Sequence, residues 1–230
     1  MFKKFGVHRK IGEVIEEAIN VVVQRLLTMQ EDGVSGREEE LTSQIRSEIT
    51  NHLLNEIKRL LDNQTINGVE FKVYTYKKKE EHNIGADLAG FVKIKYSSRE
   101  IVKAYLAQAK VCSAKTKGST LRITGNDPRI QSQANDMLRI TSDSFFFLYT
   151  DQGIYVTPAL EVQLLGKNSI DTDYLYYKKL GSFYQEFFKC FIGDHHIAPI
   201  YNDSTQLGKL ADNYSVANVI IIEANIPGDN

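Results

Sequence analysis

Two short motifs in this chain combine residue types that could carry out hydrolysis. The first, Gly85-Ala86-Asp87, places a carboxylate at the start of an apolar run, and the second, Gln108-Ala109-Lys110, places an amide and an ammonium at the end of another. Side chains two positions apart on a strand share a face, so Gln108 and Lys110 are expected to point the same way, with Asp87 facing them. This combination favours a metal-dependent phosphodiesterase.

The chemistry of such a site assigns a role to each residue. Phosphodiester hydrolysis uses a divalent ion, Mg²⁺ or Mn²⁺, that hard oxygen atoms hold on rigid strands. Asp87 is the expected carboxylate ligand, and the side-chain carbonyl of Gln108 and the backbone carbonyl of Ala109 are expected to add neutral oxygens. Lys110 is expected to orient or deprotonate the attacking water, or to stabilise charge on the phosphate.

Each motif also has a purely structural interpretation. Either tripeptide alone is common, and an Asp87–Lys110 ion pair is the structural alternative to a metal site. The combination is more informative, because both charges lie in apolar strands, where an unpaired charge is unfavourable.

Composition and charge set limits on the class of protein. The chain has 230 residues, 42% hydrophobic and 25% charged, which suits one large domain or a domain with elaborations. No apolar run reaches the roughly 18 residues that a membrane span needs, and residues 1–5 lead into a charged segment, so we expect a cytoplasmic protein without a membrane partner. Cys112 and Cys190 are expected to be buried thiols.

The net charge is −1, so no general basic excess favours nucleic-acid binding. Local basic clusters flank the two motifs, and they could either line a groove or form solvated surface. The candidate nucleic-acid contacts from these clusters are Lys77, Lys78, Lys115 and Lys117.

Hydrophobic periodicity predicts an α/β protein. Helices are predicted over residues 9–30, 35–62, 127–140, 158–165 and 174–192, and strands over 69–76, 84–95, 101–112, 144–150, 154–157 and 216–223. The first three strands are predicted to form a meander, with a polar loop over 113–126. Asp127 is expected to cap the helix that follows, with Pro128 at its first position.

Secondary features of this pattern concern polar and aromatic side chains. Gln131, Gln133 and Asn135 could contact the site or DNA, but an exposed polar helix face is the favoured interpretation. The aromatic residues of 174–192 are expected to serve core or subunit packing rather than base stacking.

Two acidic ligands hold a dication better than one, and three glutamates, Glu38, Glu39 and Glu40, lie near the start of the predicted helix 35–62. Glu38 lies three residues before Leu41 and seven before Ile45, which places it on the apolar stripe that packs towards the sheet. Glu38 also has capping-box spacing from Ser35, so it could simply close that box. Glu39 is the reserve candidate, and the sequence does not decide among Glu38, Glu39 and Glu40.

The order helix, three strands, helix, strand, together with Asp87 and Gln108-Ala109-Lys110, resembles the PD-(D/E)xK nucleases in their Q-x-K variant. The resemblance implies a restriction-endonuclease-like core (αβββαβ, a mixed sheet flanked by helices) over residues 35–157. Residues 1–34 would then be an extra N-terminal helix, and 158–230 a helical and strand elaboration of the same domain. The resemblance also implies Glu38, Asp87, Gln108 and Lys110 as the site.

More narrowly, the motifs and the small chain resemble nuclease effector subunits of bacterial anti-phage or anti-plasmid defence systems of the CBASS or Lamassu type. This implies an Mg²⁺-dependent endonuclease acting on double-stranded DNA, regulated by protein partners in a defence complex or by homo-oligomer formation. Two alternatives remain: a nuclease-fold binding module without turnover, and an RNA-directed nuclease, since motifs do not reveal readout of the 2′-hydroxyl. Cleavage specificity, oligomeric state and the activating signal are not visible in the sequence.

Overall fold

Seven strands form the central sheet in the computed structural model, which describes residues 70–77, 86–96, 99–189, 191–197 and 218–226, and residues 13, 51, 55 and 216. Their order across the sheet is β1 (Glu70–Lys77), β10 (Asn218–Ile226), β2 (Leu88–Tyr96), β3 (Arg99–Val111), β6 (Ser144–Thr150), β7 (Gly153–Pro158) and β9 (Lys178–Lys179). The pairs β10–β2 and β3–β6 are parallel, and the other neighbours are antiparallel. The sheet is therefore mixed.

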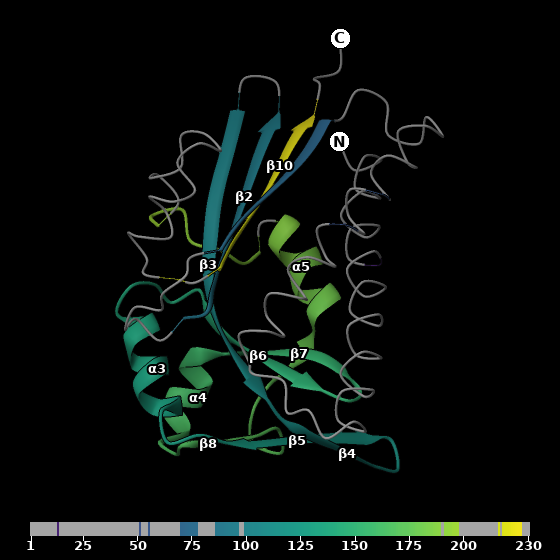
Figure 1. Ribbon diagram of the computed structural model, residues 1–230, viewed down its shortest axis with the longest axis vertical. Coiled ribbons are helices and arrows are strands. Elements are labelled where there is room, and N and C mark those ends of the chain that lie inside the picture. Colours follow the sequence, from purple (N-terminus) through teal and green to yellow (C-terminus); the bar gives the residue numbers. More distant parts are fainter. Residues whose placement is uncertain are drawn as a thin grey trace.

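A second, three-stranded sheet lies at one end of the molecule (Figure 1), and it consists of β4 (Ser113–Lys117), β5 (Thr120–Asn126) and β8 (Ser169–Asp171). The predicted polar loop over 113–126 is thus wrong. Residues 113–126 form a β-hairpin whose turn contains Gly118 at φ +62°, a conformation that glycine adopts without strain. Ala114, Leu121 and Ile123 on one face of the hairpin pack against the core.

Three described helices cover the central sheet. They are α3 (Ile130–Leu138), α4 (Ala159–Leu165) and α5 (Leu180–Phe188), and Figure 1 shows α3 and α4 close together, apart from α5. Alternate residues of β3 face different helices: Leu106 belongs to the cluster that contains α3 and α4, and Tyr105 to the cluster that contains α5. Among these described helices, none has the length and apolar character needed to cross a lipid bilayer.

The structure confirms most predicted elements, including the strands near 69–76, 101–112, 144–150, 154–157 and 216–223 and the helix 158–165. The helix expected from Asp127 begins at Ile130, and the helix expected over 174–192 begins only at Leu180, after the short strand β9. Cys112 is buried as expected. Of the predicted helices 9–30 and 35–62, the structure describes only residues 13, 51 and 55, and each of them is helical. Lys78 and Cys190 lie outside the described residues, and the domain boundaries at 34 and 157 stay a prediction.

The predicted meander of the first three strands is wrong, because β10 lies between β1 and β2. The apolar run Val219–Ile222 explains this position, since all of its side chains are buried and a strand buried on both faces belongs inside a sheet. Parallel pairing with β2 joins residues about 130 positions apart, for example Asn218 and Leu88, and local sequence order gives no sign of it.

One tyrosine on β3 organises the α5 side of the sheet. Tyr105 is fully buried, its ring contacts Phe183 and Phe187 edge-on at centroid distances of 5.0 Å, and its hydroxyl group forms a 2.7 Å hydrogen bond with that of Tyr184. Its cross-strand partner on β2 is Gly90. A Cβ atom at Gly90 would lie 2.2 Å from the Tyr105 ring, so this position has room only for glycine.

We predict that Gly90→Ala lowers the free energy of unfolding by about 1 to 3 kcal/mol, because the Tyr105 ring is held by α5 and cannot move aside. Chemical denaturation of the purified chain measures this. Gly118→Ala is the control, since nothing lies within 4 Å of a Cβ there and only the positive φ opposes alanine, at about 1 kcal/mol. Equal losses in the two variants would contradict the proposed steric role of Gly90.

A second prediction concerns alkaline pH. Burial raises the pKa of Tyr184 to about 12 and that of Tyr105 well above its ordinary value of 10.0. The neutral phenol is therefore favoured in the folded state, and the resulting stability is complete below pH 10 and is lost as the pH rises towards 12. Unfolding measured at increasing pH should show a smaller alkaline loss for Tyr184→Phe than for the natural chain; parallel losses would contradict the assignment.

Candidate functional site

Asp87 lies immediately before β2, and backbone hydrogen bonds to two neighbouring strands fix its position. Its N–H donates to Ala107 O on β3 at 2.9 Å, and its carbonyl oxygen accepts from Asn218 N at 3.0 Å and Asn218 Nδ2 at 3.2 Å. The Asp87 side chain is largely buried. The insertion of β10 beside β2 thus helps to place the candidate carboxylate.

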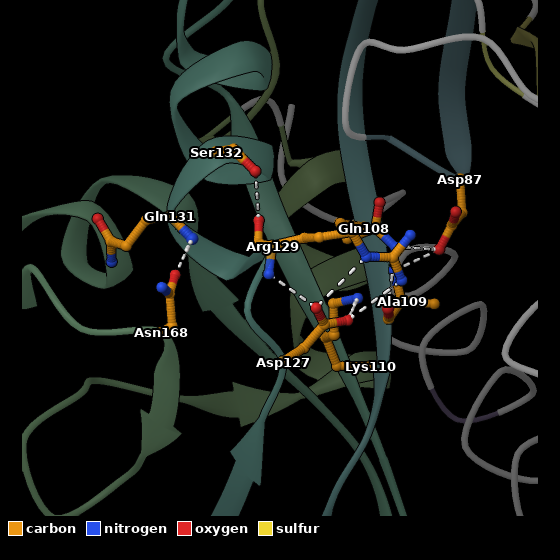
Figure 2. Close-up of polar contacts among 9 residues, drawn as sticks. All are labelled: Asp87, Gln108, Ala109, Lys110, Asp127, Arg129, Gln131, Ser132 and Asn168. Atoms are coloured by element: carbon orange, nitrogen blue, oxygen red, sulfur yellow. Dashed lines mark hydrogen bonds and ion pairs between the residues drawn. The ribbon is translucent and has the colours of Figure 1, made fainter.

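The Gln108 and Ala109 positions of β3 contact Asp87 directly (Figure 2). Asp87 Oδ2 accepts hydrogen bonds from Gln108 Nε2 at 2.5 Å and from Ala109 N at 2.9 Å, and Gln108 Nε2 also donates to Ala109 O at 3.0 Å. Gln108 is also buried. The structure therefore brings together the two motifs that the sequence singled out, on adjacent antiparallel strands.

Lys110 contacts a residue to which the sequence assigned only a capping role. Its ammonium group forms a 2.8 Å ion pair with Asp127 Oδ2, and the Lys110 side chain is only 3% exposed. Asp127 lies 17 positions further along the chain, and the hairpin β4–β5 returns the chain to this point. Burial of a charged side chain is unfavourable unless a partner compensates it, and Asp127 is such a partner.

Asp127 is itself held by the start of the α3 segment. Its Oδ1 atom accepts from Arg129 N at 2.8 Å and from Arg129 Nε at 3.4 Å, and Arg129 Nη2 lies 3.3 Å from Oδ2. Partial burial alone would raise the pKa of the Asp127 carboxyl group, but the hydrogen bonds from Lys110 and Arg129 outweigh it and hold the pKa well below its usual value. Asp127 is therefore a carboxylate at neutral pH.

A cavity of about 310 Å³ opens beside this cluster. Its lining includes the polar residues Lys110, Asn126, Asp127 and Arg129 and the apolar residues Val111 and Ile170. The sequence motifs did not predict Asp127 or Arg129 as site residues. The Asp127-Pro128 pair was the available sequence signal, since it predicted the start of a helix. It did not predict that this helix start would lie beside the end of β3.

The oxygen atoms around Gln108 are of the type that Mg²⁺ takes as ligands. Asp87 Oδ2 and Ala109 O both accept hydrogen bonds from Gln108 Nε2, so the two oxygens face one donor atom. A half-turn of the amide would present Gln108 Oε1 to the same two oxygens, an arrangement that a cation between them would stabilise. The donor atoms therefore fit a hard dication.

This donor set contains a single carboxylate, however. No group of three acidic, histidine or cysteine side chains suited to a metal occurs in the part of the chain that the structure describes. A second carboxylate is expected from Glu38 or Glu39, and both lie outside that part. The acidic ligand from residues 35–62 stays a prediction.

The candidate nucleic-acid contacts have different environments. Lys115 and Lys117 are exposed on β4, and the cross-strand partner of Lys115 is Arg122, which forms ion pairs with Asp171 and Asp173 at 2.6 and 2.9 Å. Lys77 ends β1, and its side chain lies outside the described atoms. A role for these lysines in binding stays a prediction.

Two polar residues of α3 differ from expectation. Gln131 Nε2 donates to Val162 O at 2.7 Å, and Asn135 Oδ1 accepts from Gln163 Nε2 at 2.6 Å. Both residues therefore join α3 to α4. This differs from the prediction, which placed them on an exposed polar face. By contrast, Phe183, Tyr184 and Phe187 pack in the core as expected.

In comparisons with protein-family models, curated proteins and solved structures, no significant match to this chain is found. The interpretation of the site therefore depends on its own geometry and chemistry.

The ion pair at Asp127 makes a testable contribution to stability. Because the folded-state pKa of Asp127 is lowered, this contribution is complete above pH 3.8 and is lost as the pH falls further. We predict that Asp127→Asn lowers the free energy of unfolding at pH 7 by about 1 to 3 kcal/mol, since Lys110 stays buried without its counterion. Denaturation at pH 7 and below pH 3.8 measures this, and a difference that does not shrink in acid would contradict the prediction.

Proposed function

We propose that this protein is a metal-dependent nuclease of the PD-(D/E)xK type that hydrolyses phosphodiester bonds of double-stranded DNA. The observation that carries the proposal is the contact of Asp87 with the Gln108-Ala109 segment, two positions from Lys110, at the ends of adjacent strands. A carboxylate in contact with a neutral amide, with an ammonium two positions further along the same strand, is suited to metal-assisted hydrolysis.

The order of the elements supports a restriction-endonuclease-like core. Strands β2 and β3 are antiparallel, and the chain then passes through α3 to β6, which pairs with β3 in parallel. This agrees with the last four elements of the αβββαβ order. The insertion of β10 between β1 and β2 and the hairpin β4–β5 would be additions to that core.

Each residue of the proposed site has a specific role. Asp87, Gln108 and the Ala109 carbonyl would hold Mg²⁺ or Mn²⁺, which when bound supplies charge neutralisation and a more acidic water. The hydrogen bonds from Asn218 fix the backbone of Asp87, so its carboxylate has little freedom to turn away. Lys110 is among the residues that line the cavity, and its ammonium group could stabilise charge on a phosphate.

A binding module with the same fold is the second candidate function. The ion pair between Lys110 and Asp127 favours it, because a buried lysine with a purely structural role would also be neutralised inside the protein. An RNA substrate is the third candidate, since the site offers no described contact that would distinguish a 2′-hydroxyl group.

A low-selectivity nuclease would endanger its own cell unless it were controlled. We therefore propose that the protein acts in the cytoplasm as an effector subunit, in defence against phage or plasmids, whose activity depends on a protein partner or on self-assembly. The predicted helix 9–30 is the candidate docking element. The tyrosine-rich helix near 174–192 is the other element expected from the sequence, but its residues Phe183, Tyr184 and Phe187 are packed in the core.

The test is cleavage of supercoiled plasmid DNA with Mg²⁺ or Mn²⁺ by the natural chain and by Asp87→Asn and Lys110→Met, which preserve side-chain size. We predict that each variant lowers the rate about 10²- to 10⁴-fold. Gln108→Glu, which adds the carboxylate that many PD-(D/E)xK enzymes have here, should retain cleavage and need less metal. Asp136→Asn on the outer side of α3 is the control for a folded protein.

Equal cleavage by all variants would contradict the assignment of the site. If the natural chain cuts labelled RNA of the same sequence and leaves DNA intact, the DNA part of the proposal is wrong. If neither nucleic acid is cut at high protein concentration while both are bound, the binding module becomes the better interpretation.

A further inference from the structure

The cluster at the mouth of the cavity combines two cations around one carboxylate. Asp127 Oδ2 lies 2.8 Å from Lys110 Nζ and 3.3 Å from Arg129 Nη2, so one oxygen atom contacts both groups (Figure 2). All three residues line the 310 Å³ cavity. The Arg129 side chain is 65% exposed and the Asp127 side chain 16% exposed, so the cluster can be reached from solvent.

Within this cluster, two cations face one carboxylate. Lys110 and Arg129 each contribute one positive charge and Asp127 one negative charge, because its pKa is lowered. A phosphodiester group carries a single negative charge, so two cations at one cavity are suited to bind it. Arginine is suited to this ligand, since its planar guanidinium group can hold two phosphate oxygens at once.

The backbone N–H groups at the start of α3 already donate hydrogen bonds within the protein. Binding of an anion in the cavity would therefore depend on side chains. Arg129 N donates to Asp127 Oδ1 at 2.8 Å, Ile130 N to Asp127 O at 3.1 Å, and Gln131 N to Asn168 Oδ1 at 3.1 Å. These amides are the ones that a helix N-terminus otherwise offers to a phosphate. Binding of an anion should therefore be sensitive to loss of Arg129.

We infer that Lys110, Asp127 and Arg129 together form a site for one phosphodiester group of a nucleic-acid strand. Arg129 contacts the phosphate, and Asp127 is a positioning residue that holds Lys110 and Arg129 at the cavity and limits their attraction for the phosphate. The inference deepens the proposed nuclease function and rests on it for the effect on turnover, whereas the effect on binding stands without cleavage.

Substitutions of Arg129 and of Asp127 should have opposite effects on nucleic-acid binding. Arg129→Gln removes a cation, so binding weakens about ten-fold and the slope of log affinity against log salt becomes shallower by about 0.9. Asp127→Asn removes the competing carboxylate, so binding tightens roughly five-fold and the slope becomes steeper. Turnover by Asp127→Asn nevertheless falls, because Lys110 loses its fixed position.

The helix α3 offers a matched control. Arg139 Nη1 lies 3.3 Å from Asp136 Oδ1, the same separation as in the Arg129–Asp127 pair, and neither residue lines the cavity. Arg139→Gln and Asp136→Asn make the same charge changes at the other end of the helix. They should alter affinity and salt slope far less than the two cavity variants.

The experiment is fluorescence anisotropy with the full chain, in EDTA, on a labelled DNA duplex and an RNA duplex of the same sequence, between about 50 and 200 mM salt. Weaker binding by Arg129→Gln together with tighter binding by Asp127→Asn supports the inference, and the duplex that shows both effects identifies the source of the phosphate. Thermal unfolding shows that each variant is folded, and Arg129 is exposed enough for its substitution to be tolerated.

Several outcomes would overturn the inference. These are no binding of either duplex by the natural chain, equal effects of the cavity and control variants, or weaker binding by Asp127→Asn. The test is separable from that of the proposed function. Opposite binding effects without any metal-dependent cleavage would keep the phosphate site and reject the nuclease, whereas cleavage with unchanged binding in Arg129→Gln would keep the nuclease and reject this site.

Discussion

A buried ammonium on the central strand β3 needs a counterion, and much of the local structure serves to provide it. Lys110 is only 3% exposed and forms an ion pair with Asp127. Asp127 is in turn held by a hydrogen bond from the backbone N–H of Arg129, the residue just before α3. The hairpin β4–β5 is the connection that lets Asp127 reach the end of β3. Because a buried charge without a partner is destabilising, the ion pair links the strand, the hairpin and the helix into one arrangement.

On the opposite face of β3, aromatic packing and not an ion pair holds the strand in place. Tyr105 projects towards α5, and Gly90 on β2 leaves the space that its ring occupies. The two faces of one strand therefore fix it in different ways, by aromatic packing on one side and by an ion pair on the other. This double constraint keeps Gln108 and Ala109 in register with Asp87, and the candidate site depends on that register.

The geometry connects the proposed metal site with the proposed phosphate site. Asp87 and Gln108 form one group of contacts, and Lys110, Asp127 and Arg129 form the next, with Ala109 between them on the same strand. A nucleic-acid strand has both a reacting phosphate and neighbouring phosphates. Under the proposal, one of these groups offers oxygen ligands and the other offers two cations, which suits such a ligand better than a small neutral substrate.

The sequence by itself determined the mixed α/β class, most strands, the helix 158–165 and the two motifs, because alternation and helical periodicity are local properties. It did not determine the position of β10, the hairpin over 113–126 or the partner of Lys110. These depend on contacts between residues far apart in the chain, such as Asn218 with Asp87 or Asp127 with Lys110. Only the tertiary structure decided them, because burial on both faces places β10 inside the sheet and burial of a charge selects its counterion.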